Sequence, residues 1–363
     1  VEVHPLISLS AFRMALHGPR SVVFSDIDGT LVHYLKHMKV SGSVVEVHPS
    51  NFSYVPGSSS AEAADGFQGQ MAPLEPSSQP PSAEAADGFT GSETSYREET
   101  SGAVPLEALP PSSTGLVGYV PASLKDDVNA LKDSCGARFV LVSGARWPTV
   151  RGRADALPRA EAYVSEGGGR IFYRNEDNEW TEDLQWRRVH GSDDEAQDPP
   201  VLREPLRQLA AQLREHGVTI DDKSYETMFR VPNGIDQWPV DLPPGVSVTT
   251  NLGHTDVSLE TAGKGNATRY LMEQFGVPRS AACCLCDDDN DLPMMREVGI
   301  AFVVQCTSES VAALCRESAS SSTNTSNDGG ICCVAMPEGG PAGTVAAVAS
   351  AKRWLASAAV GAS

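Results

Sequence analysis

The sequence predicts an α/β protein built on a doubly wound parallel sheet (a Rossmann-like core), with an inserted α+β domain and a long disordered loop. Short β-branched runs alternate with segments of helical periodicity, which is typical of such a sheet. A stretch rich in Ser, Pro and Gly interrupts this alternation after the first strand, and the pattern changes again between Gly167 and Thr261. Because 363 residues exceed one typical domain, we expect two domains.

Apolar runs predict the buried strands of the sheet. They are SVVFS (21–25), ARFVLVS (137–143), AACCLC (281–286), GIAFVV (299–304) and GICCVA (330–335). Helices are expected after Ser123, which with Asp126 has the spacing of a capping box, after Ser308, and from about Gly343 through Leu355. The predicted core comprises residues 20–40 and 113–166 as its first part and 260–358 as its second.

Residues 167–259 are predicted to form the inserted α+β domain. An acidic stretch is followed by a helix that ends near Gly217, and then by the strand-like runs ETMFRV and VSVTTN. The helix is predicted from leucines that share one face, namely Leu202, Leu206, Leu209 and Leu213.

Residues 41–112 are predicted to form a disordered, acidic insertion. Between Ser41 and Pro110, 28 of 70 residues are Ser, Pro or Gly, ten are acidic, and the only Lys or Arg is Arg97. Such a stretch buries too little apolar surface to offset its ordering entropy. The run SAEAADGF occurs at 60–67 and again at 82–89, which is too few copies for a solenoid. The sequence does not indicate which protein partner, if any, this loop binds.

The charge of the chain limits its partners. Lys and Arg number 28 and Asp and Glu 47, so the net charge is −19. This balance argues against general affinity for nucleic acid or anionic membranes, and there is no apolar run of about 18 residues to span a bilayer. An anionic substrate would need a local positive or metal site.

The eight cysteines lie mostly in apolar runs, as buried thiols do. A zinc site would use Cys283 and Cys286, but neighbouring residues of a strand face opposite sides and no His lies nearby. Reduced thiols predict an intracellular location, cytoplasmic or plastid. Residues 3–25 include Arg13 and Arg20 and no Asp or Glu, which fits either a transit-peptide remnant or a truncation.

Polar side chains follow the predicted strands at the edge where open parallel sheets bind ligands. Carboxylates that end two strands of one sheet converge and repel one another unless a cation neutralises them, and oxygen-only ligands favour Mg²⁺. A lysine and a hydroxyl beside them could hold phosphoryl oxygens. The candidates are Asp26, Asp28 and Thr30 after the first strand, Ser143, Gly144 and Arg146 after the second, Lys264 at a helix start, and Asp287 and Asp291 after AACCLC.

These residues resemble the motifs of the haloacid dehalogenase-like phosphohydrolases. DIDGT matches the first motif of that family, the strand end at Ser143 the second and Lys264 the third, while CDDDNDLPMM resembles the GDxxND fourth motif. The inserted domain falls between the second and third motifs, which is similar to the cap of the Cof-type and sucrose-phosphate-phosphatase-like branch. The resemblance covers residues 20–35 and 118–350.

The resemblance implies a phosphatase that works through an aspartyl phosphate. Asp26 would be the nucleophile, and Asp28 the general acid and base. Ser143 and Lys264 would stabilise the transferring phosphoryl oxygens.

The resemblance also implies a bound Mg²⁺. It would be held by Asp26, Asp287 and the backbone carbonyl of Asp28, with Asp291 supporting the metal site. The cap would close over the leaving group and set selectivity. The residues expected to contact substrate are Thr30, Gly144, Arg146 and, in the cap, Lys223, Arg230 and Asn251.

The predicted activity is therefore Mg²⁺-dependent hydrolysis of a small phosphorylated metabolite, such as a sugar phosphate. Two alternatives stay open. A phosphomannomutase-like phosphosugar mutase would share the superfamily and a similar cap. A non-catalytic binding protein with a relic site would lack Asp26, Asp28, Lys264 or Asp287, and all four are present.

Overall fold

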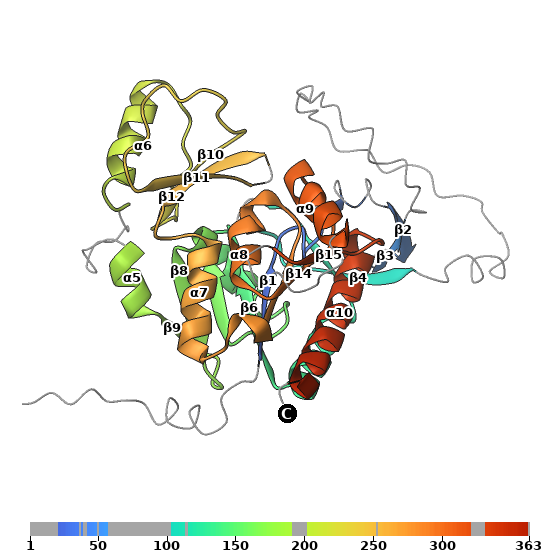
Figure 1. Ribbon diagram of the computed structural model, residues 1–363. Helices are drawn as coiled ribbons and strands as arrows, with labels where there is room; N and C mark the ends of the chain where they lie inside the picture. The colour runs from blue at the N-terminus through green and yellow to red at the C-terminus, as the bar shows by residue number, and fades with distance from the viewer. Residues whose placement is uncertain are drawn as a thin grey trace, which may run out of the picture.

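The computed structural model describes residues 21–35, 38, 42–48, 51–56, 103–112, 115–190, 202–251, 253–320 and 331–361. Its core is an eight-stranded sheet in the order β15–β14–β13–β1–β6–β7–β8–β9 (Figure 1). The strands from β15 to β7 run parallel, and β8 and β9 are antiparallel additions at one edge. Their bounds are β1 (Ser21–Asp26), β6 (Ala137–Val142), β7 (Ala162–Ser165), β8 (Arg170–Arg174), β9 (Trp180–Glu182), β13 (Ala282–Cys286), β14 (Ile300–Val303) and β15 (Cys333–Ala335).

Helices cover both faces of this sheet, which confirms the predicted fold class. In β1, Val23 packs into the apolar cluster on one face with Leu131, and its neighbour Phe24 packs into the cluster on the other face with Leu271. A strand with both faces buried reads as a continuous apolar run, as this one does. The first face carries α3 (Leu124–Cys135), α4 (Trp147–Arg153) and α10 (Gly340–Gly361), and the second carries α5 (Leu184–His190), α7 (Lys264–Phe275), α8 (Leu292–Glu297) and α9 (Glu309–Ser320).

The two serines predicted to precede helices differ in whether their side chains cap the helix. Ser308 lies just before α9, and its Oγ accepts from the N–H of Val311 at 3.4 Å. Ser123 precedes α3 but its side chain makes no capping hydrogen bond, because the residue already has helical backbone angles (φ −78°, ψ −10°). The capping box predicted there is wrong, although the helix is present.

The inserted domain, or cap, consists of α6 (Leu206–Glu215) packed on a three-stranded antiparallel sheet in the order β10–β12–β11. Its strands are β10 (Met228–Val231), β11 (Val246–Asn251) and β12 (His254–Leu259). The predicted start of the cap at Gly167 is corrected by the structure, since β8 and β9 extend the core sheet. Leu202 precedes α6 rather than lying within it, yet it joins the same apolar cluster.

The insertion predicted to be disordered contains strands, which is a second correction. A four-stranded antiparallel sheet is formed by β2 (Gly42–His48), β3 (Asn51–Pro56), β4 (Val104–Ala108) and β5 (Tyr119–Pro121). Tyr54 and Leu106 of this sheet are buried together with Ala342 of α10, so the sheet packs on the core. Residues 57–102, with both copies of SAEAADGF, lie outside the described residues.

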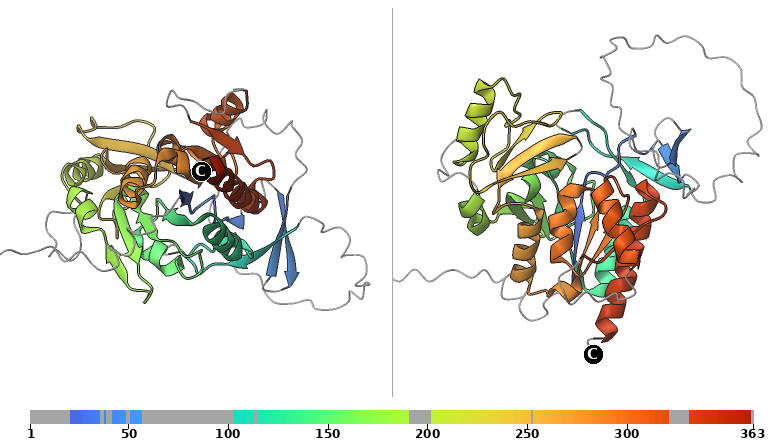
Figure 2. Two further views of the ribbon diagram at one scale, coloured as in Figure 1. Left: turned by 60° about the horizontal axis from the view of Figure 1, so that its bottom comes forward. Right: turned by 45° about the horizontal axis from the view of Figure 1, so that its top comes forward.

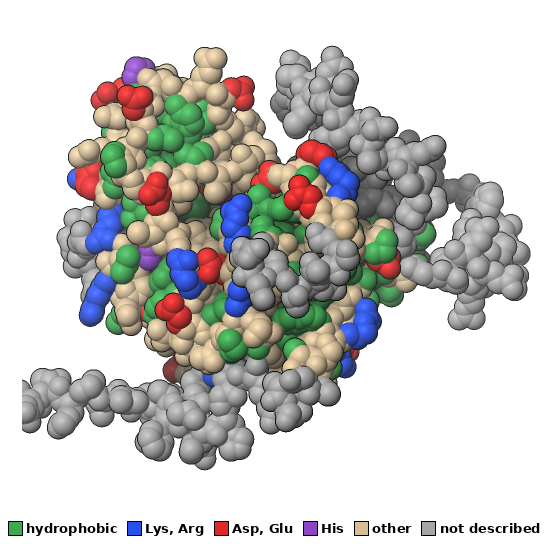
Figure 3. Space-filling view, in the orientation of Figure 1, with side chains coloured by type: hydrophobic (Ala, Val, Ile, Leu, Met, Phe, Trp, Pro, Cys, Tyr) green, Lys and Arg blue, Asp and Glu red, His purple; other side chains and the backbone are tan. Residues whose placement is uncertain are grey.

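Both additions lie toward the carboxyl edge of the core strands. In Figure 2 the cap and the sheet of β2 to β5 stand on opposite sides of that edge. On the face drawn in Figure 3, Lys and Arg side chains are scattered among other residues rather than gathered. Within the described residues, no helix has the length and apolar character needed to cross a membrane.

Candidate active site

Three buried carboxylates converge at the carboxyl edge of the sheet. Asp26 ends β1 and Asp287 follows β13, and these strands pair in parallel, so their ends coincide. Asp291 comes from the short 3-10 helix after β13, η4 (Asp289–Asp291). One oxygen from each lies within 4.8 Å of the others. Burial raises the pKa of Asp26 well above its usual value, while Lys264 opposes that shift.

Lys264 neutralises part of this charge. It is the first residue of α7 and is 3% exposed, and its Nζ donates to Asp26 Oδ1 at 2.5 Å and to Asp291 Oδ1 at 2.7 Å. Burial lowers the pKa of Lys264, but the two carboxylates raise it by more, so the net shift is upward. A cation is unfavourable at a helix N-terminus, and these ion pairs offset that cost.

The position of Lys264 depends on a close approach of two helices. A Cβ on Gly265 would lie 2.7 Å from the carbonyl oxygen of Pro293, in α8. Only glycine allows the start of α7 to pack so tightly against α8, and this contact brings Lys264 over the end of β1.

The carboxylate cluster fits a hard divalent cation. Asp287 Oδ1 accepts from Thr30 Oγ1 at 2.8 Å, whereas its buried Oδ2 has no hydrogen-bond partner. Burial and then the charge of Asp26 raise the pKa of Asp287. The donors are all oxygens, and three carboxylates against one ammonium leave two negative charges. These properties match the ligand preference of Mg²⁺.

Asp28 lies in a separate environment, although it is only two residues from Asp26. Its Oδ1 accepts from the hydroxyl of Tyr34 at 2.6 Å and from Arg153 at 3.4 Å, and its Oδ2 accepts from Ser143 Oγ at 3.3 Å. Arg153 also donates to the oxygen of Tyr34 at 3.0 Å. Ser143 in turn accepts from the N–H of Ala145 at 3.0 Å. The carboxylate is thus oriented from both sides.

Sequence reasoning missed Tyr34 and Arg153. Arg153 is 3% exposed and lies three residues after the buried Val150, so both face the same side of α4. A cation at an apolar position of a helix is unusual and could have indicated a buried partner. Tyr34 carries no comparable signal, because its contact with Asp28 depends on the turn after β1.

The residues after β6 link the core to the cap. A Cβ on Gly144 would lie 2.4 Å from Asn251 Nδ2, so the cap packs directly on this glycine. Arg146 pairs with Asp221 at 2.5 Å and lies over the ring of Tyr225, 4.5 Å from its centroid. Arg146 therefore links the core to the cap, and its predicted contact with substrate stays a prediction.

A second link lies beside it. Glu166 is fully buried, and its Oε2 accepts from the N–H groups of Glu226 and Thr227 at 2.9 and 2.8 Å. Arg170 bonds Glu182 at 2.7 and 3.0 Å and also pairs with Glu226. We call Glu166, Arg170, Glu182 and Glu226 the latch, since it ties the cap segment before β10 to the core.

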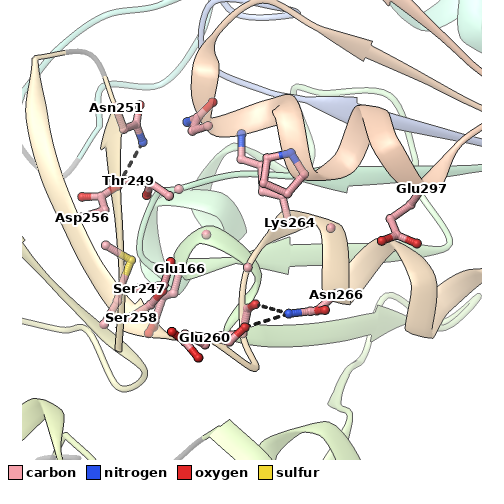
Figure 4. A pocket seen from close by; sticks show the side chains of 18 of the residues that line it. Glu166, Ser247, Thr249, Asn251, Asp256, Ser258, Glu260, Lys264, Asn266 and Glu297 are labelled. Atoms are coloured by element: carbon pink, nitrogen blue, oxygen red, sulfur yellow. Dashed lines mark hydrogen bonds between the residues drawn. The ribbon is translucent and has the colours of Figure 1, made fainter. Parts of the chain in front are cut away.

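A cavity of about 230 Å³ opens between the cap and Lys264 (Figure 4). In Figure 4, β11 and β12 form one wall, and α7 with the start of α8 forms the other. The cap side offers hydroxyl and amide groups, namely those of Ser247, Thr249, Asn251 and Ser258.

The predicted cap contacts are only partly brought to this cavity. Asn251 lines it and donates to Asp256 Oδ2 at 3.1 Å. Arg230 lies behind Asp256, which it binds through two hydrogen bonds of 2.6 and 2.8 Å. Lys223 is exposed and is not among the lining residues, so its expected orientation toward the cleft is not met.

The structure is that of an α/β protein with a buried carboxylate cluster at the strand ends, beneath an inserted cap. A family model described as haloacid dehalogenase-like hydrolase matches residues 239–334, which include Lys264 and the fourth motif. This part of the chain is therefore similar to the haloacid dehalogenase-like hydrolases, in agreement with the family resemblance and the enzyme class predicted from the sequence. The cap lies between β6 and α7, where the Cof-type and sucrose-phosphate-phosphatase-like branch carries it.

Comparison with solved structures finds similar chains at low identity. The sucrose-phosphatase of Synechocystis sp. PCC6803, solved with sucrose and phosphate, is 14% identical with a TM-score of 0.43, and the match covers 62% of this chain and 91% of that one. The trehalose-6-phosphate phosphatase of Aspergillus fumigatus is 12% identical with a TM-score of 0.39, covering 95% and 96%. A haloacid dehalogenase-like hydrolase protein of Bacillus subtilis is 14% identical with a TM-score of 0.35, covering 78% and 82%. A search of curated proteins finds no match.

Proposed function

We propose that this chain is a Mg²⁺-dependent phosphomonoester hydrolase that acts on a small phosphorylated metabolite through an aspartyl phosphate. The observation that carries the proposal is the separation of Asp26 from Asp28. Asp26 lies with Lys264 beside the carboxylate cluster, whereas Asp28 is held apart by Tyr34 and Arg153. Two carboxylates in different environments suit a nucleophile and an acid–base group.

In this mechanism Asp26 attacks phosphorus and the leaving oxygen departs on the opposite side. Asp28 gives that oxygen a proton and later removes one from the water that hydrolyses the aspartyl phosphate. Lys264 offsets charge on the transferring group, and Ser143 positions Asp28 through its 3.3 Å hydrogen bond.

Asp26, Asp287 and Asp291 would hold the metal, together with the backbone carbonyl of Asp28. When bound, Mg²⁺ supplies positive charge that offsets the phosphoryl oxygens and the cluster itself. Asp291 carries a larger share than the sequence suggested, since its oxygen lies within the same 4.8 Å group.

The cavity lining favours a leaving group with hydroxyls and no second phosphate. Its lining holds two cationic side chains, Lys264 and Arg296, and four carboxylates, those of Glu166, Asp256, Glu260 and Glu297. In the cap, Arg230 is already paired with Asp256, which lines the cavity. A mutase must hold a bisphosphate, so this acidic lining supports hydrolysis over the mutase alternative.

A screen of phosphorylated metabolites with Mg²⁺, read by phosphate release, tests the proposal. Asp26→Asn should abolish turnover, and Asp28→Asn should allow part of the phosphoenzyme to form while slowing its breakdown. Asp155→Asn is the control, because Asp155 is an exposed acid whose carboxylate pairs with Arg174 and with none of the candidate site residues.

Two results would overturn the proposal. Near wild-type turnover in Asp26→Asn on a good substrate would exclude the covalent mechanism. Binding of phosphorylated metabolites by the wild type without any phosphate release would support the relic-site alternative instead.

A further inference from the structure

Two side chains outside the carboxylate cluster converge on one oxygen of Asp28. The hydroxyl of Tyr34 donates to Asp28 Oδ1 at 2.6 Å. Arg153 donates through Nη1 to the same oxygen at 3.4 Å and to the oxygen of Tyr34 at 3.0 Å. Tyr34 comes from the turn after β1 and Arg153 from the last position of α4, so they reach Asp28 from different parts of the core. The proposed mechanism gives neither of them a step.

Stability alone does not account for a charge at Arg153. Its guanidinium is 3% exposed, and its buried Nε has no hydrogen-bond partner among the described residues. The ion pair that the structure gives it, with Asp28, has a separation of 3.4 Å. Replacing a buried ion pair by apolar side chains of similar volume is often neutral or stabilising. The arginine therefore calls for a functional explanation.

The segment before β5 holds Tyr34 and Arg153 in place. Arg153 Nη2 donates to the backbone carbonyl of Leu116 at 3.2 Å. A Cβ on Gly118 would lie 2.3 Å from Cγ1 of Val32 and 3.5 Å from Cε1 of Tyr34, so this segment packs closely on the turn after β1. Three segments that are distant in sequence thus fix the two donors around Asp28.

The two oxygens of Asp28 differ in how many donors they face. Oδ1 accepts from Tyr34 and Arg153, whereas Oδ2 accepts, within the described part of the chain, from Ser143 Oγ alone at 3.3 Å. Burial and then the charge of Asp28 raise the pKa of Tyr34, so its hydroxyl keeps its proton and remains a donor. An oxygen that already accepts two hydrogen bonds cannot carry a proton without losing one of them. Oδ2 is left to take up and release the proton.

We propose that Tyr34 and Arg153 are positioning residues that hold Oδ1 of Asp28, so that Oδ2 is the oxygen that exchanges the catalytic proton. The inference rests on the proposed function, in which Asp28 is the acid–base group. As Asp26 bonds to phosphorus and the bond to the leaving oxygen breaks, the proton on Oδ2 passes to that oxygen. As water then bonds to phosphorus and the bond to Asp26 breaks, Oδ2 takes a proton from the water.

The need for this proton depends on the leaving group. Phenyl phosphate and 4-nitrophenyl phosphate differ by one nitro group, but phenolate is the more basic leaving group and needs the proton more. Hydrolysis of the aspartyl phosphate is the same step for both substrates. A misplaced Asp28 should therefore slow phosphoenzyme formation mainly from phenyl phosphate.

Steady-state hydrolysis of these two aryl phosphates by the full chain with Mg²⁺ tests the assignment. The ratio kcat/KM reports the barrier from free enzyme and substrate, and therefore phosphoenzyme formation. Tyr34→Phe and Arg153→Met should each lower kcat/KM about tenfold for phenyl phosphate and less than about threefold for 4-nitrophenyl phosphate, as parts of the roughly 10²–10⁴-fold that acid–base catalysis contributes. If Arg153→Met does not fold, Tyr34→Phe decides, since it removes a single oxygen atom.

The chain offers a matched control for each variant. Tyr173→Phe removes a half-buried hydroxyl that donates to Asp183 at 2.8 Å, away from the carboxylate cluster. Arg138→Met removes a half-buried guanidinium that lies 4.2 Å from the ring centroid of Phe275. Both controls should keep the wild-type ratio of the two kcat/KM values.

A double-mutant cycle separates positioning from a general effect on the fold. In an Asp28→Asn background, Tyr34→Phe should change kcat/KM for phenyl phosphate by less than about twofold, because Tyr34 acts through Asp28. A further tenfold loss in that background, or equal losses for both substrates in the single variants, would overturn the assignment.

Failure of the assignment differs from failure of the proposed function. Wild-type turnover together with unchanged ratios in Tyr34→Phe and Arg153→Met would overturn the assignment and leave the proposed function standing. Absence of phosphate release from both substrates in the wild type and in every metabolite tested would contradict the proposed function and the assignment with it.

Discussion

Adding Mg²⁺ to the metal-free protein should raise its thermal stability. The cluster of Asp26, Asp287 and Asp291 carries three carboxylates against the single ammonium of Lys264, and all four groups are at least 95% buried. Burial and the charges of neighbouring acids raise the pKa values of Asp26 and Asp287, because both effects disfavour the ionised carboxylate. A divalent cation offsets the two uncompensated charges and is absent from the unfolded chain, so its binding stabilises the fold.

The expected size follows from mass action. At a hundredfold excess over its dissociation constant, a ligand that binds only the folded state adds about 2.7 kcal/mol. The unfolding entropy is about 2.1 cal/mol/K per residue, or about 0.8 kcal/mol/K for 363 residues, so each kcal/mol moves the melting temperature by about 1.3 °C and the shift should be about 3–4 °C. Asp287→Asn should remove most of it, because Asp287 supplies the buried oxygen that lacks a partner.

Differential scanning calorimetry with and without Mg²⁺, at constant ionic strength, measures this shift. Asp155→Asn serves as the matched control, since it removes a carboxylate at a side chain that is 84% exposed, and it should keep the full shift. Equal shifts in the wild type and in Asp287→Asn would refute the placement of the ion among these carboxylates. No shift in the wild type would refute metal binding at the site.

Three further predictions concern the cap and its attachment. Arg170→Met should destabilise the protein by about 3 kcal/mol in urea unfolding, because it removes the cation beside the fully buried Glu166 and leaves Glu182 and Glu226 with Arg187 alone. A loss below about 1 kcal/mol, on the order of an exposed ion pair, would show that the latch contributes little to stability. Asn251→Ala should reduce kcat/KM for the true metabolite more than for a small aryl phosphate, whereas Lys223→Ala should leave that ratio unchanged, since only Asn251 lines the cavity; equal ratios in both variants would place selectivity elsewhere. Burial lowers the pKa of His190 below its value of about 6.5 in the unfolded chain, so the protein loses stability as the pH falls from about 6.5 toward the lower pKa of the folded state. His190→Leu should therefore lose less stability than the wild type between about pH 7 and 5, and identical losses would contradict this.

The core of the fold could be predicted because its strands are buried on both faces. A run such as SVVFS needs apolar residues at every position, and β1 places Val23 on one side and Phe24 on the other. The strands of the insertion escaped prediction because composition was averaged over 70 residues. Within that average, Tyr54 packs with Leu106 of the same sheet and with Ala342 of α10, which lie far from it along the chain.

The cap boundary was misplaced for a related reason. The strands β8 and β9 are antiparallel, and an otherwise parallel sheet often carries antiparallel strands at its edge, so strand direction alone does not separate core from cap. Only their pairing shows which sheet they join, and Val164 opposite Ile171 continues the core. The local sequence pattern of a strand does not show which distant strand it pairs with.

The residues of the candidate site likewise fall into those that topology predicts and those that it does not. Asp26, Lys264 and Asp287 stand at ends of strands or helices, so a topological rule predicts their convergence. The partners of Asp28 follow no such rule, because Tyr34 and Arg153 meet only after the chain has turned.

That turn explains how one short motif supplies two different carboxylates. Asp26 still belongs to β1, whereas Gly29 has φ +96° and reverses the chain, which sends Asp28 toward β6 and α4. A Cβ on Gly29 would lie 2.1 Å from Asp287 Oδ2, the oxygen offered to the metal. The glycine is therefore required twice, once for its backbone angle and once for the space that it leaves. Without it, Asp28 could not be held apart from Asp26 while Asp287 occupied the same corner of the sheet, as the proposed mechanism requires.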